Sequence, residues 1–242
     1  MNSSFFKTLI ALIFVLLATN AYSQTNKNKP KLNISVGYLY SELDEPRSYD
    51  PTVYYDYKTE AGNGYSISGL LDFPINNFEI SLGSSFSSVR NVLIYGTPPL
   101  VDQGLWRFKE ELKMNYLNFR IVLKYYPLGW LSFQSGFRFS FPLNHQIRTL
   151  EIEEVRPHVP VPADLTLNVW EPYESFDYMD INLPLGVVIG LKRGPFIAFN
   201  YYLRLVNMTE VEESPYLTWG GHRRNTFELS VGWKFNFEKK NE

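Results

Sequence analysis

The residues of this chain best placed to do chemistry are charged side chains inside segments whose every second residue is apolar. Each charge occupies a polar position of the alternation, so it would share one face of a β-strand with small residues. Side chains of both signs on such a face can form ion pairs, and arginines in excess can bind phosphate through their planar fork of donors. The set comprises Asp72, Glu79, Arg120, Lys124, Arg138, Asp180, Arg204, Glu228 and Lys234.

Two arginines of this set are expected to face each other. If the turn at residues 127–131 is tight, Arg120 lies opposite Arg138 on the neighbouring strand. Two guanidinium groups so close repel unless an acid or a bound anion lies between them. We favour a structural salt-bridge network in which Glu79 or Glu228 reaches across. The alternative is a site for a phosphate or a lipid head group.

A second cluster is expected around Arg204. The tight turn near residue 194 should set Asn182 opposite Arg204, with Asp180 diagonal to it, and Glu228 lies on the neighbouring strand. We therefore predict one buried cluster, Asp180, Arg204 and Glu228, near the outer end of the strands.

A hydrolytic centre would need a nucleophile and a base, and the chain offers one weak pairing. Ser140 is expected on the polar face of its strand, and His145 lies just past the end of that strand. No motif supplies a third member, and a solvated loop histidine is the simpler interpretation. The other histidines, His158 and His222, form no HxxxH or HExxH spacing, and the chain has no cysteine. We therefore expect no catalytic, metal or cofactor site.

The strands that would hold these residues are recognised by their alternation. The last is the clearest, because every second residue from Phe227 to Phe237 is apolar. Eight such segments occur, each of about ten residues, which is the length that a tilted strand needs to cross a bilayer. They span about residues 32–41, 65–73, 78–86, 115–126, 131–141, 181–191, 197–205 and 227–237.

Short and long connections alternate between these segments, as in barrels with short periplasmic turns and long outer loops. Alternation alone would also allow a soluble, lipocalin-like barrel with its apolar face inward. Aromatic residues collect at both ends of the apolar phase, with Phe78 and Tyr125 at one end and Tyr38 and Tyr65 at the other, as in the girdles of a membrane wall. The sequence therefore predicts an all-β fold, an eight-stranded antiparallel up-and-down transmembrane β-barrel with a lumen filled by small and charged side chains.

The beginning of the chain and its composition agree with export. Residues 1–23 have the features of a signal peptide: Lys7, an apolar core too short to span a bilayer, and a small-x-small cleavage site. Residues 24–242 are expected to form one barrel domain. Loss of Lys7 changes the formal net charge from −2 to −3, which gives no electrostatic reason to expect nucleic acid.

Residues 31–237 resemble the small outer-membrane β-barrel domain proteins of Gram-negative bacteria. The resemblance is clearest in ELSVGWKFNF at 228–237, which is similar to the terminal strand that the barrel-assembly machinery recognises. It implies a monomer in the cell outer membrane, inserted by that machinery and in contact with lipopolysaccharide.

We expect a structural or interaction role that the outer loops perform, because a lumen this narrow excludes a general porin. Trp170 and Trp219 could anchor a protein partner. Within residues 143–177, segments 149–155 and 166–170 could form a hairpin above the membrane, or the connection could be disordered. Two alternative functions stay open: a lipid-modifying enzyme of the lipid A deacylase or acyltransferase kind, and an accessory subunit of a secretion or envelope assembly.

Overall fold

The computed structural model describes residues 29–43, 55–96, 106–154, 167–172, 179–191, 194–207 and 224–236. The predicted signal peptide lies outside the described residues, as do His158, Trp219 and His222. No helix within the described ranges is long and apolar enough to cross a membrane. The strands are β1 (Lys31–Leu43), β2 (Tyr55–Ile75), β3 (Phe78–Gly96), β4 (Trp106–Leu128), β5 (Leu131–Glu154), β6 (Glu171–Pro172), β7 (Asp180–Gly190), β8 (Gly194–Asn207) and β9 (Arg224–Asn236).

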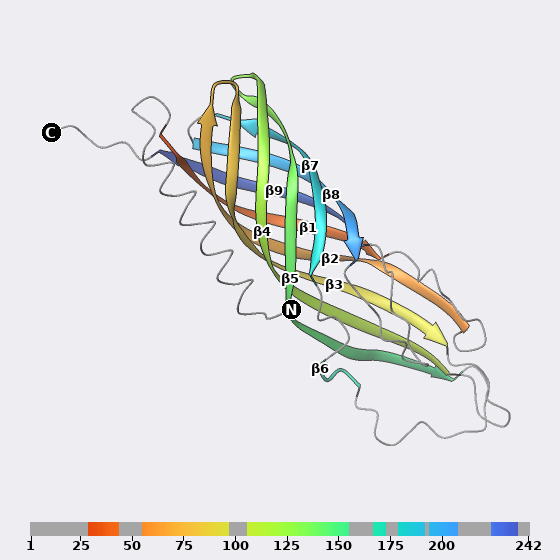
Figure 1. Ribbon diagram of the computed structural model, residues 1–242. Helices are drawn as coiled ribbons and strands as arrows, with labels where there is room; N and C mark the ends of the chain where they lie inside the picture. The colour runs from red at the N-terminus through yellow and green to blue at the C-terminus, as the bar shows by residue number, and fades with distance from the viewer. Residues whose placement is uncertain are drawn as a thin grey trace, which may run out of the picture.

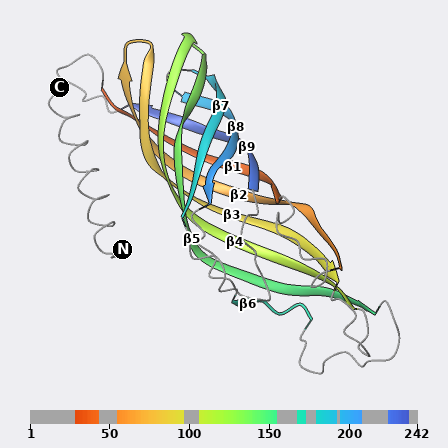
Figure 2. The same ribbon diagram turned by 45° about the vertical axis from the view of Figure 1, so that its right-hand side comes forward.

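Eight of these strands close into a ring (Figures 1 and 2). Neighbours along the chain pair antiparallel, β5 pairs with β7 as well as with the short β6, and β1 pairs with β9 to complete the circle. Short connections join β2 to β3, β4 to β5 and β7 to β8. Two of them use the left-handed backbone region, at Asn76 (φ 56°) and Gly194 (φ 101°). The predicted eight-stranded antiparallel barrel is confirmed.

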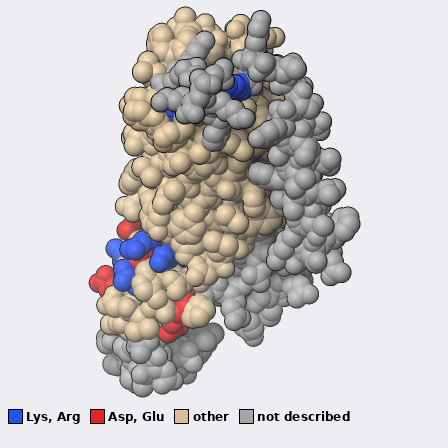
Figure 3. Space-filling view, turned by 90° about the vertical axis from the view of Figure 1, so that its left-hand side faces the viewer, with Lys and Arg blue, Asp and Glu red and all other residues tan. Residues whose placement is uncertain are grey.

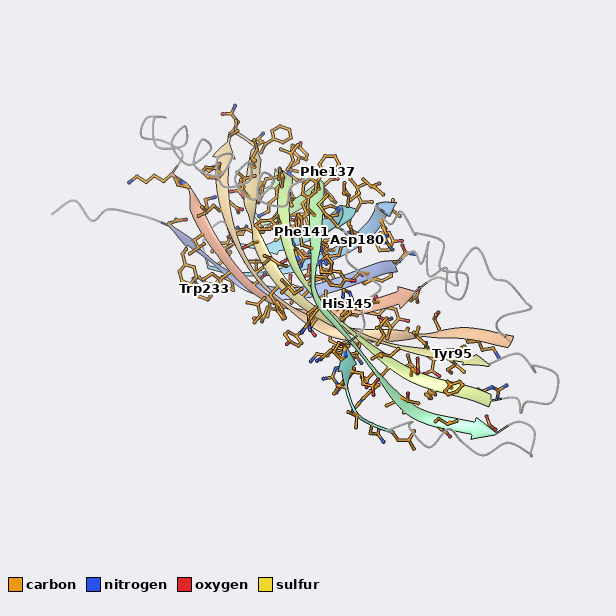
Figure 4. The ribbon with its side chains drawn as sticks, turned by 60° about the horizontal axis from the view of Figure 1, so that its bottom comes forward. Tyr95, Phe137, Phe141, His145, Asp180 and Trp233 are labelled. Carbon is orange, nitrogen blue, oxygen red and sulfur yellow. The ribbon has the colours of Figure 1, made fainter. Side chains whose placement is uncertain are left out.

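The wall of the barrel is apolar outside and polar inside. Along β9, Leu229, Val231 and Trp233 are 46 to 51% exposed, whereas Glu228 and Lys234 are only 3% exposed. A soluble barrel would reverse this order, because its apolar phase would fill the interior. Figure 4 places Trp233 on the outside of the wall, and Figure 3 shows an uncharged band with charged side chains at each end of it. This band is the surface that a bilayer would cover.

Four strands are much longer than ten residues, and here the predicted strand lengths are wrong. Strands β2 to β5 have 21, 19, 23 and 24 residues, against 11 to 14 for β1, β7, β8 and β9. Their outer halves leave the barrel together as a sheet (Figures 1 and 2). We call this the projecting sheet, formed by residues 55–64, 89–96, 106–115 and 144–154, with β6 paired to Gln146 and Ile147 of β5.

An apolar cluster packs on the inward side of the projecting sheet. Leu93, Leu112, Met114 and Tyr116 are at most 5% exposed and contact one another, and Tyr95 packs against them. Strands β4 and β5 pair irregularly between Asn115 and Tyr116, where Leu143 is the extra residue on β5. A bulge of this kind turns a strand and shifts its side chains between faces. The projecting sheet thus has its own small core at the junction with the barrel.

The predicted hairpin within residues 143–177 differs from the structure. Strand β5 continues to Glu154, and its partner over this stretch is β4. The later segment touches β5 through β6 and through a hydrogen bond from the Asn168 N–H to the Thr149 carbonyl, 2.8 Å long. Strand β5 thus pairs with β4 along one edge, and on its other edge the later segment pairs with it only over a short stretch.

The seam between β5 and β7 is the irregular part of the wall. Its pairs stop at Ser135 with Leu185 and resume at Arg138 with Asn182. Pro184 lies in the gap and has no backbone N–H to donate. The register on the two sides of the gap is the same, so the strands stay aligned across a stretch with fewer cross-strand hydrogen bonds.

Candidate functional site

The end of the lumen nearest the short turns holds a buried carboxylate that accepts four hydrogen bonds from three side chains. Asp72 on β2 accepts hydrogen bonds from Lys124 at 2.9 and 3.0 Å, from Ser81 at 2.6 Å and from Asn33. Its side chain is fully buried, and that of Lys124 is 4% exposed. The strands β1 to β4 present these groups because each is an inward position of its own alternation.

Glu79 belongs to the same end of the barrel. It accepts hydrogen bonds from Lys31 at 2.6 Å and from the Tyr126 hydroxyl at 2.5 Å, and Lys234 donates to that hydroxyl at 3.1 Å. Glu79 therefore does not reach Arg120 as one version of our prediction had it. It is the first inward residue of β3 after the turn, too far along the strand from the centre of the lumen.

Glu228 is the acid at the centre of the lumen. It accepts hydrogen bonds from Arg120 at 3.3 Å, from Asn200 at 3.4 Å, and from the hydroxyls of Ser66 and Tyr202. The side chains of Glu228 and Arg120 are 1% and 7% exposed. Donors from β2, β4 and β8 thus meet a carboxylate on β9, so this one group ties both sides of the barrel together.

Arg120 and Arg138 lie opposite each other in the β4–β5 register, as predicted. The ring of Tyr202 lies near both guanidinium groups, 4.3 Å from Arg138 Cζ and 5.3 Å from Arg120 Cζ. An aromatic face attracts cations, so the tyrosine reduces the repulsion that the bare pair would have. Glu228 supplies the negative charge beside them.

The predicted cluster of three around Arg204 is only partly present. Asn182 pairs with Arg204 in register, and Arg204 Nη2 lies 2.5 Å from Asp180 Oδ1. Glu228 is not part of this pair, because the β8–β9 register sets it opposite Asn200. That position is four residues from Arg204, about 13 Å along the strand.

Ser140 and His145 have other partners than each other. The Ser140 hydroxyl accepts hydrogen bonds from Arg138 Nε at 3.1 Å and from Asn182 at 3.4 Å. His145 lies 3.4 Å from the Tyr116 hydroxyl and makes an edge contact with its ring. Arg138 and Asn182 both act as donors to Ser140, so neither is a base that could take the serine proton. Within the described part of the chain, no group of three metal-ligating side chains occurs.

The outward face of the projecting sheet carries a charged group that the sequence analysis missed. Arg90 on β3 pairs in register with Lys113 on β4, and Glu111 binds Arg148 with an Nε to carboxylate distance of 2.6 Å. Trp170 lies against this group, 4.6 Å from Arg148 Cζ and 5.9 Å from Lys113 Nζ. Arg90, Glu111 and Lys113 continue the outward phase of their membrane strands, so the sequence carried a signal for them. Arg148 faces outward only because the bulge in β5 shifts the phase of that strand, which alternation alone does not reveal.

The closed ring, the apolar outer wall and the ion-paired interior define a transmembrane β-barrel of the outer-membrane type. No family model matches the chain, and no curated protein matches it. Similar solved structures include Ail, the attachment invasion locus protein of Yersinia pestis, at 12% identity over 86% of this chain and 99% of that one, with a TM-score of 0.45.

Two further solved structures are similar at lower identity. Neisserial surface protein A is 9% identical over 88% of this chain and 100% of that one, with a TM-score of 0.39. The translocator domain of the autotransporter NalP from Neisseria meningitidis is 7% identical over 96% and 97%, with a TM-score of 0.30. At these scores the class of the protein rests on the geometry of its own barrel.

Proposed function

We propose that this protein is an outer-membrane surface protein with an interaction role, which it performs through the projecting sheet and not through its lumen. The observation that carries the proposal is the contrast between the two ends of the long strands. Four strands continue roughly ten residues beyond the apolar wall, while the lumen between them is filled by buried ion pairs. A sheet that extends so far into water offers a surface to a partner, and a filled lumen offers no path to a solute.

Three inferences accompany this role. Residues 1–23 would act as the export signal, and the barrel-assembly machinery would insert the mature chain as a monomer. The buried charges would serve closure and stability and would not bind an anion, because Glu228 and the Tyr202 ring already accompany Arg120. The short turns would face the periplasm and the projecting sheet the exterior.

Single-cysteine labelling tests the location and the orientation, because the chain has no cysteine of its own. Glu153→Cys lies on the projecting sheet with its native side chain 60% exposed, and Asn77→Cys lies in the β2–β3 turn. On intact cells a membrane-impermeant maleimide should label position 153 and leave position 77 unlabelled until the outer membrane is permeabilised. The reverse pattern, or labelling of neither in a membrane fraction, would contradict the proposal.

The same cysteine tests the interaction role. A cleavable crosslinker attached at position 153 should capture a partner, whereas the position 77 variant serves as the matched control. Capture of a secretion or envelope subunit from the same cell would favour the accessory-subunit alternative. A barrel that yields no adduct from either position would leave the projecting sheet without a partner and would count against the interaction role.

We also propose that the barrel has no catalytic role. The partners of Ser140 support this, since Arg138 and Asn182 both donate hydrogen bonds to the serine oxygen. Mass spectrometry of lipid A from a deletion strain is the test. An acyl pattern that changes on deletion, and returns with the wild-type chain but not with Ser140→Ala, would establish the lipid-modifying alternative.

A further inference from the structure

The outward face of β3, β4 and β5 changes character in successive rows of paired residues. The last apolar row is Phe86, Leu117 and Phe141. A polar row follows, Ser88, Asn115 and Asn144, and then comes a row of Arg90, Lys113 and Gln146. The cations lie four residues beyond the apolar row on β3 and β4, about 13 Å along strands that are tilted in the membrane. Long basic side chains at this height reach the level of lipid head groups.

The charges in these rows do not balance. Arg90 and Lys113 are direct cross-strand partners, an arrangement that is unfavourable for like charges. Among the described residues of this face, the acid in contact with these cations is Glu111, which is bound to Arg148 and lies 3.6 Å from Arg90. Two arginines therefore share one carboxylate, and Lys113 adds a third positive charge beside them. The side chains of Arg90 and Arg148 are 53% and 28% exposed, so an external anion can reach both.

Charges farther from the membrane are balanced, which makes the surplus specific to this height. Lys109 lies 3.8 Å from Glu60, and Arg107 lies 3.3 Å from Glu153. Figure 3 shows the charged side chains gathered directly beyond the uncharged band. In the part of the sheet that the structure describes, the surplus positive charge thus belongs to the rows closest to the apolar wall, where lipid phosphates would lie.

Apolar side chains accompany the cations. Trp170 packs against Arg148 and Lys113, and its neighbours Leu167 and Val169 are 51% and 49% exposed. Leu143, the extra residue at the β5 bulge, is 57% exposed. Tryptophan and exposed aliphatic side chains beside basic ones are typical of the interface between lipid and water. A partner that offers phosphate and hydrocarbon together fits this surface better than one that offers phosphate alone.

We propose that Arg90, Lys113 and Arg148, with Trp170, form a binding site for the phosphorylated head group of an outer-leaflet lipid. The phosphate would lie between Arg90 and Lys113 and relieve their repulsion, and Trp170 would hold Arg148 and Lys113 in place. Trp170 then contacts lipid and is not the protein anchor that the sequence suggested. The site rests on the proposed location in the outer membrane, with the projecting sheet outside.

Lipid titration of the purified barrel in detergent tests the site. Native mass spectrometry would count molecules of lipid A bound to the folded wild-type chain, to Arg90→Gln/Lys113→Gln, and to Arg107→Gln/Lys109→Gln. The first variant should bind about ten times more weakly than wild type, because it removes the surplus charge. The second variant removes the same amount of charge from balanced rows of β4, and it should stay within about twofold of wild type. Migration on an unboiled gel would confirm that each variant is folded.

Two further measurements test whether the bound phosphate belongs to a lipid or is the free ion. Lipid A from which the phosphates have been removed should bind the wild-type chain as weakly as lipid A binds Arg90→Gln/Lys113→Gln. Inorganic phosphate at millimolar concentration should not displace lipid A, and displacement would show that the site accepts the free ion. Equal affinities for both double variants would overturn the proposal. These measurements use purified protein and do not depend on its orientation in a cell. A negative result from cysteine labelling would therefore contradict the proposed location without changing the measured affinity for lipid A.

Discussion

The barrel wall and the projecting sheet are built from the same strands but have opposite polarity. Around the lumen, apolar side chains face outward and ion pairs such as Arg120 with Glu228 lie inside. In the projecting sheet, Leu93 and Leu112 are buried on the inward side, while Arg90 lies exposed on the outward side. The reversal takes place where the strands leave the bilayer for water, near the bulge at Leu143. The surrounding solvent, lipid or water, therefore determines which face of the same sheet carries the apolar side chains.

The largest effect should follow from removal of the central acid of the lumen. Glu228→Ala leaves the Arg120 guanidinium buried without its carboxylate, which should destabilise the barrel by about 3 to 5 kcal/mol. Urea unfolding in lipid vesicles, followed by tryptophan fluorescence, would measure the loss. Glu153→Ala removes an exposed acid of the projecting sheet and should change stability by less than about 0.5 kcal/mol. Similar midpoints for both variants would mean that the lumen network contributes little.

The next largest effect should come from a charge placed on the outward face, because its cost in stability should differ between the barrel wall and the projecting sheet. Val231→Lys puts an ammonium group on the lipid-facing side near the middle of β9, at a cost of about 2 to 4 kcal/mol. Val92→Lys makes the same change on the outward face of the projecting sheet and should be nearly neutral, because water solvates the charge there. The comparison uses the same unfolding assay. An equal loss of stability for the two variants would mean that both residues face the same solvent. It would contradict the proposed boundary between lipid and water.

A cavity in the small core should affect the projecting sheet alone. Leu112 is 1% exposed, and Leu112→Ala should destabilise the local packing by about 2 to 3 kcal/mol. Trypsin cleavage at nearby basic residues should accelerate while the barrel resists the protease. Leu123→Ala on the same strand removes a lipid-facing side chain that is 50% exposed, and it should leave the cleavage rate unchanged.

The smallest effect concerns pH. Burial raises the pKa of Glu110 above its ordinary value of 4.5, and the nearby Glu171 adds to this, although hydrogen bonds from Tyr95 and Thr149 oppose it. A raised pKa means that the folded sheet favours the protonated acid, so this contribution to stability is full below about pH 4.5 and is lost as pH rises through the folded pKa. Trypsin should therefore cut a Glu110→Gln variant with less pH dependence than the wild-type sheet. Parallel profiles for the two chains would exclude Glu110 as the cause.

The sequence was sufficient to predict the structure of the barrel wall, where one face of each strand is apolar toward lipid and the other is polar toward the lumen. Alternation located the strands of the wall, and tight turns fixed the cross-strand pairs of Arg120 with Arg138 and of Asn182 with Arg204. It failed for the projecting sheet, because the alternation in segments such as 107–113 has the opposite polarity to that of the wall and is interrupted by Glu110. For Glu228 it was right in one respect and wrong in another: the acid reaches across the lumen to Arg120, as one version of the prediction had it, but it does not join Arg204.

The interrupted seam at Pro184 has a mechanical consequence. A closed ring of strands resists lateral pressure from lipids through its hydrogen-bonded joints, and the joint between β5 and β7 has fewer of them beside Gly136 and Phe137. If the circumference of the wall ever changes, it will yield first along this joint, and the backbone amides there will be the earliest in the wall to exchange with deuterated water.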